Sequence, residues 1–215
     1  MGDKLEAGVV MEPITLPEPK KRGGKPLLEA LALRQTTRDI SSKEIPLQVL
    51  SDLLWSAFGV NRKKASFGKT GRTAPSASNS QEIDLYVALE SGLFVYDAIP
   101  HQLIPIAAGD FRMFSGHRYA LDRINDTPVN IFYVVDLTRY DLGPDQPDPH
   151  IGESEVQKSY YYTDTGFIAQ NINLFAASEG LATWFHNCDR EHIKIEFKIR
   201  PSQRILFAQT VGYPL

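Results

Sequence analysis

The sequence lacks several features that would assign it to a common class. Its 215 residues contain one cysteine, Cys188, so no intrachain disulfide is possible. It has no run of about 18 apolar residues, so we expect no membrane-spanning segment and no membrane partner. The formal net charge is −3 and no long basic block is present, which argues against a nucleic-acid partner. The first residues contain no hydrophobic signal core. We therefore expect a cytoplasmic protein and leave open a leader removed upstream.

The usual signatures of protein-borne catalysis are also missing. There is no GxSxG, no GxGxxG after a strand, no phosphate-binding P-loop and no obvious acid–base pair among the Asp and Glu residues. His186, Cys188 and His192 match no common zinc spacing, so we predict no metal site. Nothing near Cys188 in the sequence would activate it as a nucleophile. The sequence therefore predicts no catalytic side chain, which is typical of a protein whose cofactor carries out the chemistry.

The composition is that of a globular protein, with 42% hydrophobic and 23% charged residues. Residues 1–25 are rich in proline, glycine and polar residues, which predicts an extended arm that either frays or lies along a partner. Residues 26–215 are predicted to form a single domain. The short basic clusters at 20–22 and 62–64 are expected on the solvated surface.

Hydrophobic spacing predicts the main elements of this domain. Helices are expected at 26–33, 46–58, 158–179 and over most of 190–199, and residues 101–125 favour helix over strand. Strands are expected at 83–90, 93–98, 181–186 and 204–214, and the stretch 129–136 is apolar on both faces, as in a central strand. Helices and strands mix without strict alternation, and one hairpin looks antiparallel, so the pattern favours an α+β fold.

Two polar stretches are candidate binding segments. Residues 34–39, RQTTRD, place two arginines around two threonines, which suits an anion clamp. The alternative is a surface helix end whose cations lie near the helix C-terminus. Residues 75–81, PSASNSQ, combine hydroxyls with the amides of Asn79 and Gln81, which suits the imide edge of a flat heterocycle. The alternative is a serine-rich turn that caps a helix or strand.

Five motifs in order resemble those of the FMN-dependent nitroreductase family. These are R-x-S/T-x-R/K at 34–38, P-S-x-x-N-x-Q at 75–81, a long helix at 158–179, G-L-x-T at 180–183 and G-Y-P at 212–214. The stretches LLWSAFGVNR and GRTAPSASNSQEIDLYVAL resemble the branch near the SagB-type azoline dehydrogenases. The resemblance covers roughly residues 26–215.

The resemblance implies a nitroreductase-like α+β fold. Its central sheet is mixed, mostly antiparallel and flanked by helices, and the chains form an intertwined homodimer with FMN at the subunit interface. Helices 48–58 and 158–179 would pack the dimer, and the polar residues Gln170 and Asn173 are expected to face the pocket or the partner. Trp184 and Phe185 are expected to fill core, with a narrowing of the substrate space as the alternative. The cofactor-binding residues implied are Arg34, Gln35, Thr36 and Arg38 near the phosphate and ribityl chain, then Pro75, Ser76, Ala77, Ser78, Asn79 and Gln81 along the ring from the other subunit, and His186 and Asn187 near flavin N5 or O4.

The function implied is an FMN-dependent oxidoreductase. NAD(P)H would reduce the flavin, which would pass hydride to a nitroaromatic, a quinone or a similar acceptor in a ping-pong cycle. Two alternatives stay open at this point. One is an FMN-dependent dehydrogenase that oxidises an azoline-like organic substrate, and the other is a flavin-binding protein without turnover.

Overall fold

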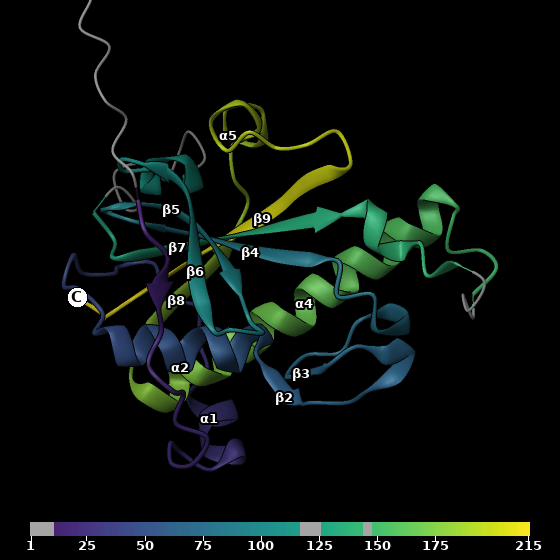
Figure 1. Ribbon diagram of the computed structural model, residues 1–215. Helices are drawn as coiled ribbons and strands as arrows, with labels where there is room; N and C mark the ends of the chain where they lie inside the picture. The colour runs from purple at the N-terminus through teal and green to yellow at the C-terminus, as the bar shows by residue number, and fades with distance from the viewer. Residues whose placement is uncertain (1–10, 117–125, 144–147) are drawn as a thin grey trace, which may run out of the picture.

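The computed structural model describes residues 11–116, 126–143 and 148–215, and shows an α+β fold (Figure 1). A seven-stranded sheet has the order β1-β6-β5-β4-β7-β9-β8, and each neighbouring pair is antiparallel. Its strands are β1 (Ile14–Thr15), β4 (Ile83–Leu89), β5 (Gly92–Asp97), β6 (Gln102–Ala108), β7 (Val129–Asp136), β8 (Ala182–His186) and β9 (Gln203–Gly212). A separate hairpin joins β2 (Val60–Arg62) to β3 (Gly71–Arg72).

Helices cover both faces of this sheet. On one face lie α1 (Leu27–Leu33), α2 (Leu47–Phe58) and the long α4 (Ser154–Glu179), and on the other lies α5 (Arg190–Glu196) (Figure 1). Each face has its own apolar core, and β7 contributes to both because all eight of its residues are buried. The prediction of a central strand over 129–136 is therefore confirmed. No helix in the described ranges is long and apolar enough to cross a membrane.

Most helix ends lie where the sequence indicated, although α4 begins at Ser154, four residues before the predicted start. Pro26 and Pro46 immediately precede α1 and α2, where a fixed φ and a missing N–H cost nothing. Gly180 ends α4 in the left-handed conformation, with φ of 70°. The apolar face of α2, however, is buried in the core of its own chain. The expectation that this face packs a dimer is therefore wrong.

Two further segments differ from expectation. Residues 102–108 form strand β6, not a helix, because they hydrogen-bond to β5 and to β1, and this pairing overrides a weak local preference. Residues 117–125 lie outside the described part of the chain. Within the predicted arm, Ile14–Thr15 forms the edge strand β1, and the Lys20 N–H donates to Asp52 Oδ1 at 2.7 Å. Residues 11–25 thus lie along their own chain.

The segment after α1 is tied to the end of β9. Ile40 pairs with Pro214, and the Ser41 N–H donates to the Tyr213 carbonyl at 2.8 Å. Gly212 makes this close passage possible, since a Cβ there would lie 2.5 Å from Ile40 Cγ2 and 2.9 Å from Pro128 Cδ. The glycine of the G-Y-P motif therefore has a steric reason, and it helps to fix residues 34–41.

We predict that Gly212→Ala lowers the free energy of unfolding by about 1–3 kcal/mol, because Ile40 and Pro128 must move apart. Chemical denaturation measures the change. Gly152→Ala is the matched control, since nothing lies within 4 Å of a Cβ there. Equal stabilities for the two variants would contradict this account of Gly212.

Candidate functional site

The arginine-rich segment leaves α1 at Arg34 and is held as a non-helical strip beside β8. The Thr37 N–H donates to the Thr183 carbonyl at 3.0 Å. The side chains of Gln35 and Thr37 line a cavity of about 240 Å³ together with residues of α4 and β8. The predicted phosphate ligands Arg34, Thr36 and Arg38 are exposed and do not line it. Within the described part of the chain, neither arginine forms an ion pair.

A buried polar network lies beneath this strip. The Tyr133 hydroxyl donates to Gln209 Oε1, and Gln209 Nε2 donates to Asn173 Oδ1 and to Thr183 Oγ1, each at 2.9 Å. Asn173 Nδ2 in turn donates to Gln170 Oε1 at 3.2 Å. Asn173 also lines the 240 Å³ cavity, whereas Gln170 does not, and a role of either residue at a cofactor pocket or a partner stays a prediction. The network fixes β8, and with it the strip, to α4.

The end of β8 forms the neighbouring wall. The Arg38 guanidinium lies 5.4 Å from the centre of the Trp184 ring, and the His186 ring lies 4.7 Å from that same ring. His186 Nε2 is 2.9 Å from Thr210 Oγ1, and burial lowers the pKa of His186. Asn187 follows on the surface. Trp184 is therefore part of this surface and not of the core.

Two other residues of this segment, Phe185 and Cys188, point inward. Phe185 packs against Tyr133 and Phe207, with ring centres 5.7 and 4.8 Å apart, so it fills core as expected. Cys188 is buried, and burial raises the pKa of its thiol to about 12. It stays protonated at neutral pH, in agreement with the prediction that it is not a nucleophile. In the described ranges, no three His, Cys, Asp or Glu residues are grouped to hold a metal ion.

The second predicted segment, residues 75–81, forms a tight loop around the 3₁₀ turn η2 (Ala77–Asn79) before β4. Ser78, Asn79 and Gln81 have φ of 51°, 51° and 56°. This left-handed region costs a non-glycine residue about 1 kcal/mol, so surrounding bonds must hold the loop. Pro75 is exposed, and Ser76 Oγ accepts the Gln81 N–H at 3.0 Å. The loop is therefore ordered by its own chain.

The two amides of this loop are already used. Asn79 Nδ2 donates to the carbonyls of Ser66 and Thr70, and Gln81 Nε2 donates to Thr70 O and Asn79 Oδ1. Gln81 Oε1 accepts from Arg72 Nε at 2.7 Å. These amides hold the loop that joins β2 to β3. Their hydrogen-bonding groups are therefore not free for the expected direct pairing with the edge of a heterocycle. The exposed parts of Pro75–Ser78 remain for a ligand.

The strip and the loop are attached to different parts of α4. The loop contacts Asp164, whereas the cavity beside the strip is lined by Asn173 and Ala177. Asp164 and Asn173 are nine residues apart, or about 14 Å along the helix axis. Within one chain, the strip and the Trp184–His186 wall therefore lie together. The 75–81 loop lies apart from both.

Sequence reasoning missed a pair of buried acids under the loop. Glu82 and Asp164 are 0% and 4% exposed. Asp164 Oδ2 accepts the Ala77 N–H at 2.9 Å, and Glu82 Oε2 accepts the Ser80 hydroxyl at 2.6 Å. Glu82 Oε1 has no hydrogen-bond donor when both carboxyls are ionised. A proton on Asp164, donated to that oxygen, satisfies both groups.

Electrostatics favours the same state. Burial first, and then the neighbouring Glu82 carboxylate, raise the pKa of Asp164 to about 8. The two acids are distant in the sequence, so no spacing reveals them. One signal was present, because Asp164 lies four residues before Ile168 on the buried face of the helix.

We predict that this pair makes stability fall with rising pH. Because the folded-state pKa of Asp164 lies above its unfolded value, the folded chain binds the extra proton between about pH 4 and pH 8. The free energy of unfolding then decreases across that window, by up to about 1.4 kcal/mol per pH unit. Asp164→Asn keeps an acceptor for Ala77 and adds a donor for Glu82. It should flatten the dependence and stabilise the protein at pH 8 by on the order of 2 kcal/mol.

Glu155→Gln is the control, since Glu155 is an exposed carboxylate on the same helix. Urea denaturation at pH 5, 6.5 and 8 gives the comparison. Parallel profiles for the wild type and Asp164→Asn would rule out the shared proton.

Comparison with known proteins agrees with this architecture. The profile of the Nitroreductase family matches residues 31–213. A candidate nitroreductase of Ralstonia eutropha JMP134 is 32% identical and superposes with a TM-score of 0.83, over 97% of this chain and 92% of that one. A candidate nitroreductase of Methanocaldococcus jannaschii, MJ1384, is 26% identical over 181 residues, which is 79% of this chain and 85% of that protein.

A more distant structure bears on the expected branch. The Escherichia coli microcin synthetase McbBCD complex matches with a TM-score of 0.64 at 16% identity, over 81% of this chain and 66% of that one. This likeness is one of fold, so a place near the SagB-type branch stays a prediction. The family match spans most of the sequence and includes every described element from α2 to β9. The chain belongs to the nitroreductase family of oxidoreductases.

Proposed function

We propose that this protein is an FMN-dependent oxidoreductase that NAD(P)H reduces and that passes hydride to nitroaromatics, quinones or similar acceptors. The observation that carries the proposal is the strip at 34–38. Arg34 and Arg38 are exposed within five residues of each other, and neither has a carboxylate partner in the described part of the chain. Two such guanidinium groups suit a phosphate.

The residues around the strip fit that role. Alternate residues of an extended segment point to the same side, so Arg34, Thr36 and Arg38 share one side. Gln35 and Thr37, on the other side, line the small cavity beside α4 and β8. The Thr37 N–H bond to the Thr183 carbonyl anchors the segment there. A phosphate monoester would bind to two cations and a hydroxyl whose backbone segment, residues 34–38, is already held in place. The binding of such an anion is stronger when its ligands are preorganised.

The separation of the strip and the loop supports a site made by two chains. In a two-fold dimer, the loop of one chain can approach the strip of the other, and the reverse contact then forms as well. Leu27, Leu28 and Leu31 of α1 are exposed by 63%, 79% and 46%. An apolar surface of this kind is typical of an interface. We therefore include a homodimer in the proposal, with α1 in place of the α2 face.

Bound FMN would supply the hydride chemistry, and this chain would supply binding and position. Arg34 and Arg38 would hold the phosphate. Backbone N–H groups at His186 and Asn187 would face the polar edge of the ring, where a fixed donor stabilises added charge. The His186 side chain holds this strand end through Thr210. Within the described chain, no side chain is required as an acid or base if hydride moves directly to and from the ring.

The runner-up function is a dehydrogenase that oxidises an azoline-like organic substrate. The fold shared with the microcin synthetase complex and the SagB-like stretches favour it. Anaerobic mixing with NADH and NADPH separates the two, because rapid bleaching of the flavin supports the reductase. Flavin that ignores both nucleotides, but is bleached by an azoline peptide and restored by oxygen, supports the dehydrogenase. Flavin that responds to neither substrate supports a binding protein without turnover.

We expect the double variant Arg34→Ala/Arg38→Ala to bind FMN at least about 100-fold more weakly, because two charge-assisted contacts are lost. Equilibrium dialysis with FMN measures this. Lys63→Ala/Lys64→Ala removes two exposed cations from the β2–β3 hairpin and serves as the control. Unchanged flavin occupancy in a folded Arg34→Ala/Arg38→Ala protein would refute the phosphate assignment.

A further inference from the structure

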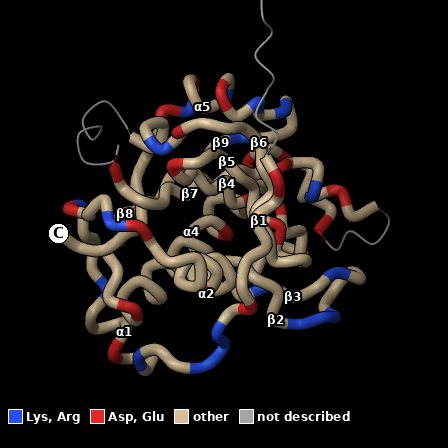
Figure 2. The backbone as a smooth tube through the Cα atoms, turned by 60° about the vertical axis from the view of Figure 1, so that its left-hand side comes forward, with Lys and Arg blue, Asp and Glu red and all other residues tan. Residues whose placement is uncertain are grey.

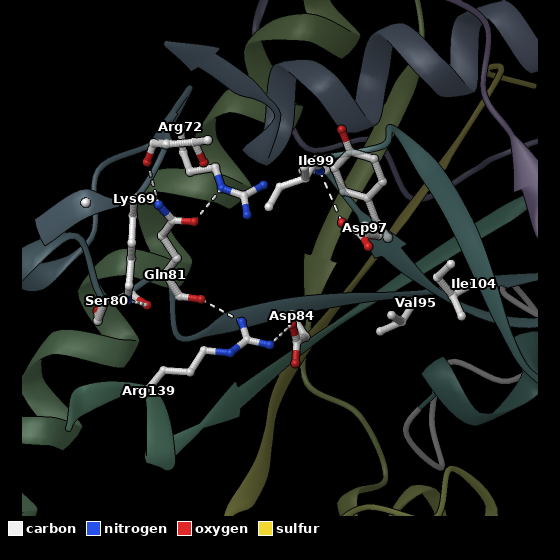
Figure 3. Close-up of a pocket in the computed structure, with 14 residues that line it drawn as sticks. Lys69, Arg72, Ser80, Gln81, Asp84, Val95, Asp97, Ile99, Ile104 and Arg139 are labelled. Carbon is white, nitrogen blue, oxygen red and sulfur yellow. Dashed lines mark hydrogen bonds and ion pairs between the residues drawn. The ribbon is translucent and has the colours of Figure 1, made fainter. Parts of the chain in front are cut away.

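A second cavity, of about 590 Å³, lies between the β2–β3 hairpin and the sheet (Figure 3). The hairpin and loop supply one wall, and strands β4, β5 and β6 supply the other. None of Arg34, Arg38, His186 and Asn187 lines it. It is therefore separate from the proposed phosphate strip, and its volume is in the range of small-molecule sites.

Two cations face this cavity and bind only neutral acceptors. Lys69 Nζ donates to the Ser80 carbonyl at 2.9 Å. Arg72 donates to Gln81 Oε1 at 2.7 Å and to the Phe58 carbonyl at 3.2 Å, with its guanidinium 5.2 Å from the Phe58 ring centre. Among the ion pairs of the described residues, neither cation takes part.

The third cation of the cavity is already neutralised. Arg139 Nη2 donates to Asp84 Oδ1, and its Nη1 donates to the Gln81 carbonyl, both at 2.6 Å. The remaining acid is Asp97, which accepts the Ile99 N–H at 3.1 Å and lies across the cavity from Lys69 in Figure 3. The charge is thus divided, with two unpaired cations on the hairpin wall and one carboxylate on the far side.

Burial disfavours the charged form of both unpaired cations. Burial first, then Arg139 and Arg72, lower the pKa of Lys69, while Glu82 opposes the shift. Burial first, and then Arg139, lower the pKa of Arg72, while Asp97 and Asp84 oppose the shift. A partly buried cation without an anion is costly, and a bound anion would remove that cost. The single carboxylate opposite favours an anion with one charge over one with two.

The rest of the lining indicates the body of the ligand. Val95 and Ile104 are half-buried on the sheet wall, and Ile99 is 71% exposed at its edge. These aliphatic side chains would contact an apolar body beside the cations (Figure 3). We propose that this cavity is a binding site for a small aliphatic monocarboxylate, held by Lys69 and Arg72. The proposal does not depend on the bound flavin or on its substrate.

The test is titration of the purified protein with 4-methylpentanoate at neutral pH, followed by calorimetry and by the methyl NMR signals of the isoleucines. We expect saturable binding that shifts the signals of Ile99 and Ile104. The neutral analogue 4-methylpentanamide should bind at least tenfold more weakly, and so should inorganic phosphate. Equal binding of the amide, tighter binding of phosphate, or no saturable binding of the carboxylate would each overturn the proposal.

Substitutions of the lining residues test which side chains bind the carboxylate. Lys69→Gln should weaken carboxylate binding about five- to tenfold, and Arg72→Gln should weaken it more, because a fork of donors is lost. Asp97→Asn should tighten binding a few-fold by removing a like charge. Lys64→Gln, on the exposed hairpin surface, should leave it unchanged, and so should Arg34→Ala/Arg38→Ala. If Arg72→Gln fails to fold, Lys69→Gln and Asp97→Asn decide alone. Unchanged affinity in both of them would overturn the assignment.

Discussion

The buried face of α4 is the constraint on which both predicted cofactor segments depend. Most of that face is apolar, and Ile168, Ile172 and Ala176 pack against the sheet. It also carries Asp164, which holds the backbone of the 75–81 loop, and Asn173, which joins the network under the arginine strip. Asp164 is buried, and a buried polar group is costly unless it is satisfied, so it fixes its partner strongly, while Asn173 is half-buried at the edge of the network. A single helix thereby sets the distance between two segments that one chain does not bring together.

Charge is handled in two different ways in this molecule. Below the loop, two acids share a small buried space, and a shared proton lowers the cost of their proximity. Arg34 and Arg38 on the strip, and Lys69 and Arg72 at the larger cavity, have no carboxylate partner among the described residues, whereas Arg139 at that cavity pairs with Asp84. Figure 2 shows that other Lys and Arg residues gather on the arm and on the β2–β3 hairpin, where they face solvent. Lys69 and Arg72 differ from these because backbone carbonyls and the Gln81 amide oxygen hold them in place.

The sequence predicted most of the fold because its signals were local. Proline and glycine marked the helix ends, and the doubly apolar run at 129–136 identified the central strand. Strand β6 was missed because its pairing with β1 and β5 is not visible in its own residues. The arginine strip was found from its motif. The role of the Asn79 and Gln81 amides was not, because their acceptors lie about ten residues upstream in a loop whose folded shape no spacing reveals. Glu82 and Asp164 were missed for the same reason, since only tertiary packing makes them neighbours.

The central claim is that two copies of this chain form two equivalent flavin sites. The most direct test is size-exclusion chromatography of the purified protein with added FMN, with light scattering and the visible absorption spectrum recorded together. The account predicts a dimer that elutes yellow and releases about one FMN per chain on denaturation, as two-fold symmetry requires. A folded protein that elutes colourless after FMN is added, or a monomer that carries FMN, would contradict it.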